Sequence, residues 1–352
     1  MTGHLLGALS GLELCAGHLD IRDPRPISTL GRLDLRNIAL GLRHAWELDR
    51  MLARSARNVG VHISISQVTW GFLRDSVFVA VARARGHRVY IHLHGGLLAR
   101  FYRTSRPPMR WVIRRVLGQA HRAWALTPSL RSQFDGLVPS ELVACLPNVV
   151  EDPLAGSPGK RELDRGTALR ILHLSNLLPD KGCFDLLAAL RQLGTASARW
   201  EVRVVGSGTP EIERRLRAEI SQLERMGGAR VDLLGELTGS AKHEQYRWAN
   251  VFAYPTQYPP EGQPLVLLEA MGAGLPVVAT RWAGIPDTVS DQQEGLLVEP
   301  GNTAELARAL LQISTEPELR LALSAAARKR YEDCYRPERL AADLLDLLAT
   351  DA

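Results

Sequence analysis

Residues 251–286, VFAYPTQYPPEGQPLVLLEAMGAGLPVVATRWAGIP, are the stretch that decides the fold of this chain. The apolar run at 251–254 predicts a buried strand, and a loop rich in Pro and Gly follows it. Pro264 suits the first position of a helix, because its fixed φ fits a helix start and its missing N–H is not needed there. A helix is predicted over 265–273 and a second strand over 275–280. This βαβ unit implies a parallel sheet.

Two carboxylates in this stretch indicate a ligand site. Glu269 stands in an apolar helix, where a carboxylate is costly unless a partner compensates it. Glu261 lies in the loop that leads into the same helix. Free N–H groups at a helix start attract anions, and ligands of open α/β sheets bind beyond the carboxyl ends of the strands. A phosphate flanked by two carboxylates suits a sugar nucleotide. The residues alone leave open that Glu261 is a solvated loop acid and Glu269 a paired structural one.

The length and composition set the class of protein. The chain has 352 residues, which is enough for two domains, and it is 45% hydrophobic and 23% charged, as globular proteins are. No apolar run reaches the length of a membrane span, and no clear signal peptide is present, so we expect a cytoplasmic protein. The four Cys have no CxxC spacing, which favours reduced thiols over a zinc site or a disulfide framework.

The basic residues are unevenly distributed. Residues 1–158 contain 20 Arg, no Lys and 11 acidic residues, whereas the remainder contains 23 basic and 27 acidic residues. The segment 99–125 has seven Arg interleaved with Phe, Tyr and Trp, a pattern typical of a helix that lies on anionic lipid. We therefore expect contact with an anionic membrane surface, with a solvated basic face over a core of aromatics as the equal alternative. No recognition motif accompanies the segment, so nucleic-acid binding is not expected.

The first half alternates strands with helices, which predicts a second Rossmann-like sheet. Strands are predicted at 61–66, 88–94, 123–127 and 142–146. His94 ends the second of these and precedes Gly95 and Gly96, and glycines let a backbone approach a ligand closely. His94 is therefore a candidate site residue, with His92 and then His62 as competitors and a satisfied strand-end histidine as the structural alternative.

The stretch 261–280 closely resembles the Glu-x7-Glu signature of the retaining glycosyltransferases of family 4, also called glycosyl transferases group 1. The residues that match are Glu261, Gly262, Pro264, Leu265, Glu269, Ala270, Gly274, Pro276 and Val277. The resemblance implies the α/β fold known as GT-B, in which two Rossmann-like domains face each other across a cleft. It also implies an acceptor-side domain at 1–158, a nucleotide-sugar domain at 159–333, and a final helix at 334–352 that crosses back to the first domain.

The resemblance also implies an activity. The expected reaction moves a sugar from a nucleoside diphosphate sugar to a hydroxyl, with retention, in cell-surface polysaccharide or glycolipid synthesis. The expected partners are the nucleotide-sugar donor and a glycan or lipid-linked acceptor, at the inner face of the membrane. Neither a metal nor another cofactor is expected.

The resemblance assigns roles to particular residues. Glu261, His94 and Lys181 are the catalytic candidates. The donor-binding candidates are Glu269, Asn176, Gly206, Gly208, Gly262, Gln263, Pro264, Leu265, Gly95 and Gly96. Lys181 matches a family Lys that contacts the donor diphosphate, whereas Asn176 stands where the family has an Arg, so one cation is missing.

The start of the chain departs from the family pattern. Family members begin with a strand and a glycine-rich loop, whereas this sequence opens on a predicted helix at 1–14. We therefore expect the first domain to lack that strand and loop. Two alternatives stay open. One is an epimerase or phosphorylase of the same architecture, although 261–280 and 175–182 fit the transferases better. The other is a non-catalytic protein that binds a nucleotide sugar or associates with a membrane.

Overall fold

The computed structural model describes residues 17–19, 21, 35–56, 59–155 and 169–349. The chain divides into two compact units. The C-terminal unit is Asn148–Arg339, and the N-terminal unit is Thr2–Pro147 together with Leu340–Ala352, which includes most of helix α13 (Pro337–Ala349). The helix predicted at 1–14, and with it the expectation of a missing strand and glycine loop, lies outside the described residues.

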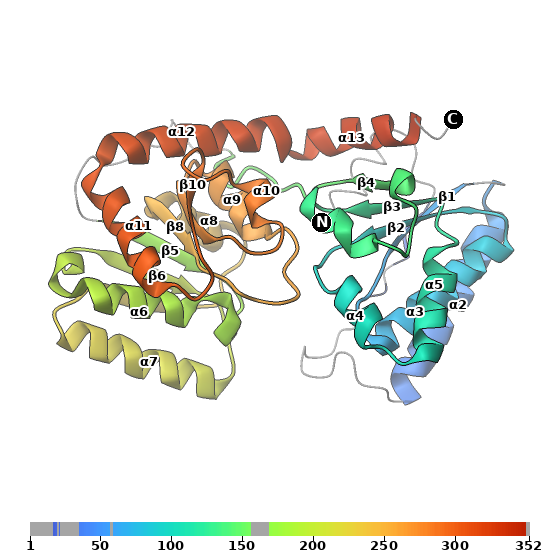
Figure 1. Ribbon diagram of the computed structural model, residues 1–352, viewed down its shortest axis with the longest axis horizontal. Coiled ribbons are helices and arrows are strands. Elements are labelled where there is room, and N and C mark those ends of the chain that lie inside the picture. Colours follow the sequence, from blue (N-terminus) through green and yellow to red (C-terminus); the bar gives the residue numbers. More distant parts are fainter. Residues whose placement is uncertain (1–16, 20, 22–34, 57–58, 156–168, 350–352) are drawn as a thin grey trace. The chain divides into compact units, whose positions relative to one another are not determined.

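The N-terminal unit contains a parallel sheet in the order β1-β2-β3-β4 (Figure 1). The strands are β1 (Gly60–Ser64), β2 (Arg88–Leu93), β3 (Arg122–Ala125) and β4 (Val143–Cys145). The helices are α2 (Leu35–Arg54), α3 (Thr69–Ala84), α4 (Leu98–Thr104) and α5 (Pro107–Leu117), with 3₁₀ turns η2 (Ser129–Phe134) and η3 (Ser140–Leu142) before β4. The predicted alternation of strands and helices is confirmed.

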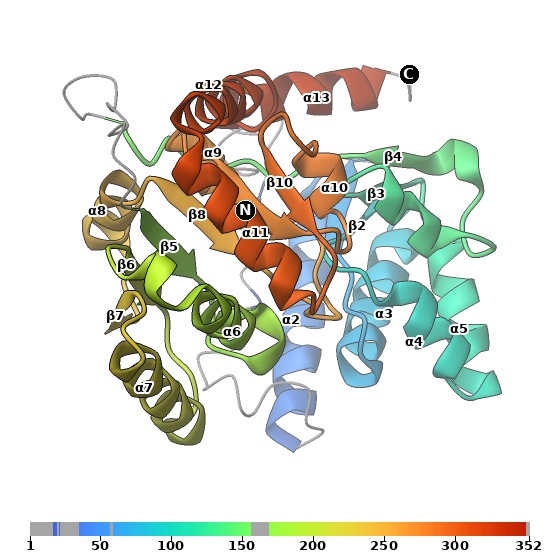
Figure 2. The same cartoon turned by 60° about the vertical axis from the view of Figure 1, so that its left-hand side comes forward.

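The C-terminal unit contains a parallel sheet in the order β10-β9-β8-β5-β6-β7 (Figure 2). Its strands are β5 (Arg170–Leu174), β6 (Glu201–Val205), β7 (Arg230–Gly235), β8 (Val251–Tyr254), β9 (Val277–Thr280) and β10 (Gly295–Val298). Its helices are α6 (Cys183–Leu193), α7 (Pro210–Arg225), α8 (Gly239–Trp248), α9 (Leu265–Gly272), α10 (Ile285–Thr288), α11 (Thr303–Thr315) and α12 (Pro317–Cys334). The 3₁₀ turns are η4 (Pro179–Lys181) and η5 (Gly194–Ser197).

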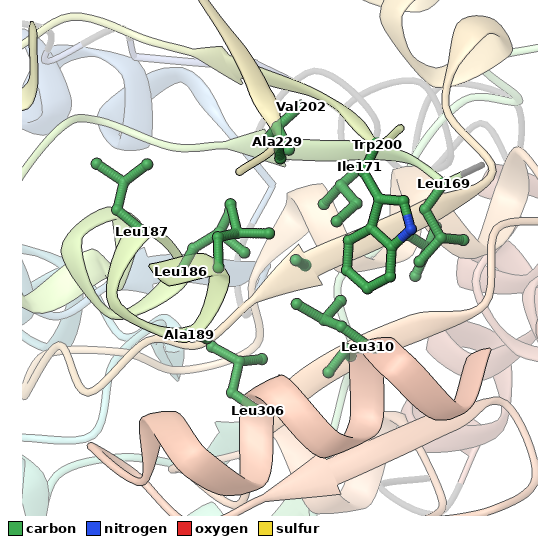
Figure 3. Close-up of a cluster of buried hydrophobic side chains, with 14 of the residues drawn as sticks. Leu169, Ile171, Leu186, Leu187, Ala189, Trp200, Val202, Ala229, Leu306 and Leu310 are labelled. Atoms are coloured by element: carbon green, nitrogen blue, oxygen red, sulfur yellow. The ribbon is translucent and has the colours of Figure 1, made fainter. Parts of the chain in front are cut away.

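Both faces of this second sheet are covered by helices. Successive strand residues point to opposite faces, so Ile171 packs with residues of α6, α7 and α11, while Leu172 packs with residues of α8, α9 and α12. Figure 3 shows the first of these cores, in which Leu310 of α11 approaches Ile171 and Trp200. Burial of one such Leu or Ile side chain contributes about 1.5–3 kcal/mol. These two cores fix the carboxyl ends of the strands.

The stretch that decides the fold forms β8, α9 and β9 as predicted, with differences at the helix ends. Helix α9 begins after Pro264, whose ψ of 123° is extended, and the carbonyl of Pro264 accepts a hydrogen bond from the Leu267 N–H at 3.2 Å. Pro264 is therefore the cap of the helix and not its first residue. Gly274, with a φ of 66°, follows the last turn. In the part of the chain that is described, no helix has the length and hydropathy needed to cross a bilayer.

Candidate functional site

A cavity of about 330 Å³ lies at the carboxyl ends of β5, β6, β7 and β8 in the C-terminal unit. Six predicted site residues line it, namely Asn176, Lys181, Gly206, Glu261, Pro264 and Leu265. Of the described side chains on its walls, Lys181 is the one basic group, whereas Glu236 and Glu261 are acidic. The parallel topology thus brings together residues that are up to 89 positions apart in the sequence, from Asn176 to Leu265.

Lys181 and Glu261 form an ion pair at the wall of this cavity. Lys181 Nζ lies 2.8 Å from Glu261 Oε2, and the two side chains are 13% and 9% exposed. Thr256 donates a further hydrogen bond to the same carboxylate oxygen at 3.4 Å. Because a buried charge is tolerated only when it is paired, each of these groups makes the burial of the other possible. The interpretation of Glu261 as a solvated loop acid is wrong.

Tyr254 completes this network from the end of β8. Its hydroxyl accepts a hydrogen bond from Lys181 Nζ at 3.1 Å and donates one to Glu261 Oε2 at 3.0 Å. Burial, reinforced by the charge of Glu261, raises the pKa of Tyr254 well above its ordinary value. The phenol therefore stays protonated and acts as a fixed donor to the carboxylate.

Glu269 is compensated by a second lysine. Its Oε1 lies 2.7 Å from Lys242 Nζ, and its Oε2 accepts a hydrogen bond from the Tyr246 hydroxyl at 2.7 Å. The Glu269 side chain is 15% exposed and lies outside the cavity wall. Lys242 and Tyr246 are four residues apart on α8, so they share one face of that helix.

The sequence prediction did not identify Lys242, but the composition contains a signal. The whole chain has four Lys among 43 basic residues. Two of these four, Lys181 and Lys242, pair with the two carboxylates of the Glu-x7-Glu stretch. Because Lys is rare in this chain, a search for the cations of the site could have started from these four positions.

Two glycines, Gly206 on the cavity wall and Gly182 next to Lys181, bring backbone segments into close contact. Gly206 has a φ of 141°, and a Cβ there would collide with the carbonyl oxygen of Ser175. Gly182 has a φ of 89°, and a Cβ there would collide with the carbonyl oxygen of Pro255. Both positions therefore exclude other residues by conformation and by space. The backbone that each glycine approaches is the chain's own, so contact between Gly206 and a donor remains a prediction.

Gly208 lies in the same turn as Gly206 but is not on the cavity wall. A Cβ on Gly208 would lie 2.8 Å from the carbonyl oxygen of Leu177. The turn is held there by a hydrogen bond of 2.8 Å from the Leu177 N–H to the Ser207 carbonyl. Gly208 thus allows the turn after β6 to lie against the turn after β5.

Gln263 is committed to holding the loop before α9. Its Oε1 accepts a hydrogen bond from the Asn148 N–H at 2.7 Å, and its carbonyl accepts one from Asn148 Nδ2 at 2.9 Å. Its Nε2 donates to Thr288 Oγ1 at 3.2 Å. The neighbouring carbonyl of Gly262 accepts a hydrogen bond from the Gly284 N–H at 3.1 Å. Both ends of the Gln263 amide therefore serve the fold, which favours a positioning role over donor contact.

His173 was not predicted, because it stands in a buried strand. One ring nitrogen, Nδ1, lies 2.9 Å from the carbonyl of Ala253, and the other, Nε2, lies 3.0 Å from Ser175 Oγ. The carbonyl only accepts, so Nδ1 donates to it and Nε2 accepts from the serine hydroxyl. Burial lowers the pKa of His173 to about 4. The neutral imidazole thus fixes the hydroxyl of Ser175, which lines the cavity.

His94, Gly95 and Gly96 follow β2 in the N-terminal unit, where three histidines gather. His94 Nε2 lies 3.2 Å from Ser64 Oγ, and its ring centroid lies 4.2 Å from that of His92. His92 Nδ1 in turn lies 3.2 Å from His62 Nε2. His92 therefore packs against His94, and His62 in turn contacts His92, so both alternatives to His94 help to position its ring.

Burial keeps this histidine cluster neutral. It lowers the pKa of His62 to about 3 and that of His94 to about 4, and it lowers the pKa of His92 well below the ordinary value. All three rings are therefore uncharged at pH 7. In the described ranges, this cluster included, no three His, Cys, Asp or Glu side chains are grouped as ligands of a metal ion would be.

Residues 160–330 match the family model described as glycosyl transferases group 1. A GDP-mannose-dependent alpha-(1-6)-phosphatidylinositol monomannoside mannosyltransferase of Mycobacterium tuberculosis is 29% identical over 259 residues, which are 70% of this chain and 66% of the relative. The monoacylated-substrate counterpart from Corynebacterium glutamicum is 31% identical over 183 residues, 50% of this chain and 46% of the relative. The chain thus spans less than two thirds of the length of these relatives.

Solved structures show the same fold. Anabaena HepE in complex with UDP superposes with a TM-score of 0.71 at 19% identity, over 89% of this chain and 82% of that protein. Sucrose-phosphate synthase from Thermosynechococcus elongatus gives a TM-score of 0.69 at 19% identity, over 91% and 80% of the two chains. The predicted resemblance is confirmed: the C-terminal unit belongs to the group 1 glycosyltransferases, and the chain has the GT-B fold.

Proposed function

We propose that this chain is a retaining glycosyltransferase that moves a sugar from a nucleoside diphosphate sugar to the hydroxyl of a glycan or lipid-linked acceptor. The observation that carries the proposal is the Lys181–Glu261 pair at the wall of the cavity, beside the start of α9. The mycobacterial relative, which is named for GDP-mannose and a phosphatidylinositol mannoside, supports a nucleotide-sugar donor and a lipid acceptor. HepE, which binds UDP, supports the same class of donor.

Lys181 and the start of α9 would hold the donor diphosphate. A helix start offers free N–H groups to an anion, and Lys181 adds a formal positive charge. As the bond between the sugar and the diphosphate breaks, negative charge grows on the leaving group, and a preplaced cation stabilises it. Lys181 then shares its ammonium between the diphosphate and Glu261, because an ammonium has three donors.

The two carboxylates would hold hydroxyl groups. Glu261 accepts hydrogen bonds from the hydroxyls of the sugar and stabilises its electron-poor anomeric centre. Glu269 accepts from the ribose hydroxyls, since an ionised carboxylate has about four acceptor positions and the structure occupies one on each oxygen. His94, as a neutral imidazole, would contact the transferred sugar. The reaction would need no metal, and activity that survives removal of divalent cations by EDTA would bear this out.

Nucleotide binding tests this proposal. Lys181→Ala and Glu269→Ala should each weaken binding of the nucleoside diphosphate by about 1–3 kcal/mol, the usual cost of a lost charged hydrogen bond. Isothermal titration calorimetry measures the effect, after a thermal-shift screen finds the nucleotide that stabilises the protein. Lys329→Ala is the matched control, because Lys329 is an exposed lysine that pairs with Asp333 on α12. Equal affinities for all four proteins would refute the assignment.

The N-terminal unit suggests how the enzyme meets a lipid acceptor. Trp111 of α5 is 67% exposed, and the exposed side chains of Arg103, Arg106 and Arg115 lie on α4, on α5 and between them. Trp124, by contrast, is 3% exposed in β3 and belongs to the core. We propose that α4 and α5 dock peripherally on anionic membranes, with Trp111 at the interface.

Vesicle flotation tests this docking. Changing Arg103, Arg106 and Arg115 to Glu should abolish flotation with anionic vesicles, because each Arg near such a surface contributes about 1 kcal/mol. The control changes Arg214 and Arg225 to Glu, since both are exposed on or at the end of α7 in the other unit. Flotation that both proteins lose equally would show a general charge effect and remove the docking proposal.

A further inference from the structure

An aromatic ring that the proposed chemistry does not use lies against Lys181. The Nζ atom of Lys181 is 4.3 Å from the centroid of the Tyr258 ring. A ring face attracts a cation that lies within roughly 6 Å of its centroid. Two N–H groups of the same ammonium are committed to Glu261 and to the Tyr254 hydroxyl, at 2.8 and 3.1 Å. The ring of Tyr258 thus adds a third contact to a charge that two hydrogen bonds already hold.

This third contact comes from a side of the ammonium that the cavity does not reach. Lys181, Tyr254 and Glu261 line the cavity wall, whereas Tyr258 does not. The ring therefore does not compete with a ligand for space. A ring face attracts the charge as a whole and needs no hydrogen bond, so the third N–H of Lys181 stays available to a diphosphate oxygen.

The position of Tyr258 depends on Trp282, which follows β9. The indole Nε1 of Trp282 donates a hydrogen bond to the Tyr258 carbonyl at 2.8 Å. The same carbonyl accepts a hydrogen bond from the Glu261 N–H at 3.0 Å. The Trp282 ring is partly buried against the core that α8, α9 and α12 share, so it is itself anchored. One tryptophan thus helps to place both the ring and the carboxylate that contact Lys181.

The backbone at Ala283 shows that this turn is held against its own preference. Its φ is 48°, in the left-handed region that a residue with a Cβ rarely adopts. On one side of it Trp282 bonds to Tyr258, and on the other the Gly284 N–H donates to the Gly262 carbonyl at 3.1 Å. Strain of this kind persists where the surrounding contacts determine the conformation, and it is common at functional sites. The turn therefore grips the loop on both sides of Glu261.

We propose that Tyr258 is a positioning residue for Lys181 and that Trp282 holds Tyr258 in place. The inference rests on the proposed function, because the diphosphate is what the positioned ammonium binds. A lysine has a flexible four-carbon stem, and a cation stabilises a leaving group best when its position is fixed beforehand. The role belongs to the aromatic ring and not to the tyrosine hydroxyl, so phenylalanine should replace Tyr258 and leucine should not.

The NMR signals of the lysines test the contact without any ligand. The chain has four Lys, so selective ¹³C labelling of lysine gives few ε-methylene signals, and the signal that Lys181→Ala removes is that of Lys181. An aromatic face shifts the protons above it upfield. Tyr258→Leu should abolish this shift at Lys181, Tyr258→Phe should keep it, and Trp282→Phe, which deletes the indole N–H, should reduce it.

Calorimetry with UDP, GDP and inorganic pyrophosphate tests the consequence for binding. Tyr258→Leu should weaken all three by a similar factor of about 3–10, because the ring acts at the diphosphate, and Tyr258→Phe should restore the affinity. In protein that already carries Lys181→Ala, Tyr258→Leu should have no further effect, since a residue that acts through Lys181 is then without its target. Trp46→Leu is the matched control, because it removes a ring that lies 4.6 Å from the Arg50 guanidinium in the other unit.

The possible failures are distinguishable. An unchanged Lys181 signal in Tyr258→Leu would overturn the inference, and so would an equal loss of affinity with and without Lys181, since the ring would then act on the fold alone. If the three probes bind the unchanged protein and Tyr258→Leu equally well, the positioning role fails while the proposed function stands. If none of them binds the unchanged protein, the proposed function fails, whereas the lysine signals still decide whether the ring holds Lys181.

Discussion

The two units place buried polar groups at the carboxyl ends of their sheets in opposite ways. The N-terminal unit gathers His62, His92 and His94, three neutral rings that contact one another. The C-terminal unit buries formal charges, and each of its two signature carboxylates holds one lysine and one tyrosine. The difference agrees with the proposed roles of these residues. A cluster of neutral rings suits the uncharged sugar of the donor, and paired charges suit its diphosphate.

The buried ion pairs and the neutral histidines also respond differently to substitution and to acid. A buried ion pair is weak evidence of stability, but removal of one partner leaves an uncompensated charge in a low-dielectric site. A buried neutral imidazole carries no such risk at pH 7, and its burial becomes unfavourable only when the pH falls far enough to protonate it. The C-terminal site is therefore sensitive to substitution and the N-terminal cluster to acid.

The largest loss of stability is expected when only one charge of the Lys181–Glu261 pair is removed. Lys181→Met should destabilise the protein by about 3–5 kcal/mol, because it leaves Glu261 buried without its cation. The double variant Lys181→Met/Glu261→Gln should recover most of that loss, since both charges are gone. Denaturant unfolding measures both. Equal losses in the single and double variants would mean that the pair has no mutual dependence.

Acid should destabilise the two units to different extents. The pKa of His173 is about 4 in the folded protein and about 6.5 when unfolded, so the unfolded chain binds the extra proton between these values. Stability is therefore fully present above pH 6.5 and falls toward pH 4, by about 3 kcal/mol for this one group. The N-terminal unit holds three such histidines, with a pKa of about 3 for His62 and about 4 for His94.

Hydrogen exchange between pH 7 and pH 4 measures this difference region by region. Amides of β2 and β3 should lose protection at a higher pH than amides of β8 and β9. His173→Asn is the control, because it should flatten the pH dependence of the C-terminal unit alone. Simultaneous loss of protection in both units would remove the contrast.

A smaller effect is expected from the amide pair that holds the signature loop. Gln263→Ala should cost about 1–3 kcal/mol of unfolding free energy, because it leaves the buried N–H of Asn148 without its acceptor. Gln263→Glu keeps that acceptor but loses the donor to Thr288 and buries a carboxylate that has no described cation beside it, so its cost should be at least as large. Thermal unfolding with and without nucleotide separates a loss of stability from a loss of affinity. An Ala variant as stable as the parent would remove the positioning role.

The sequence predicted the parts of the site that lie in one continuous motif. Residues 251–280 predicted β8, α9 and β9 because each element has its own local pattern, and the odd carboxylates were visible within it. Lys181 was identified through the resemblance. The partners of these residues were missed because Lys242, Tyr246 and His173 come from other elements, and only the sheet order brings them near. The period of the hydrophobic residues predicts which face of an element is buried, but it does not predict which polar side chains from different elements pair with one another.

The contacts that Gly206 and Gln263 make within the chain could not be predicted for a related reason. A glycine after a strand predicts close approach of some backbone, but the sequence does not show whether that backbone belongs to a ligand or to the next turn. In Gly206 and Gly182 the neighbour is the chain itself. Gln263 was assigned to the donor by its place in the motif, whereas both ends of its amide are already bonded within the fold.

The left-handed backbone of Gly182 has a practical consequence for engineering. Any programme that randomises residues around Lys181 to accept new donors would find position 182 closed to every other amino acid, while Asp180 on the other side is exposed and free to vary. Libraries should therefore spread outward from Asp180 and Asn176. Variants at position 182 should fail to form the turn that places Lys181 next to Glu261, so they would add no useful members to such a library.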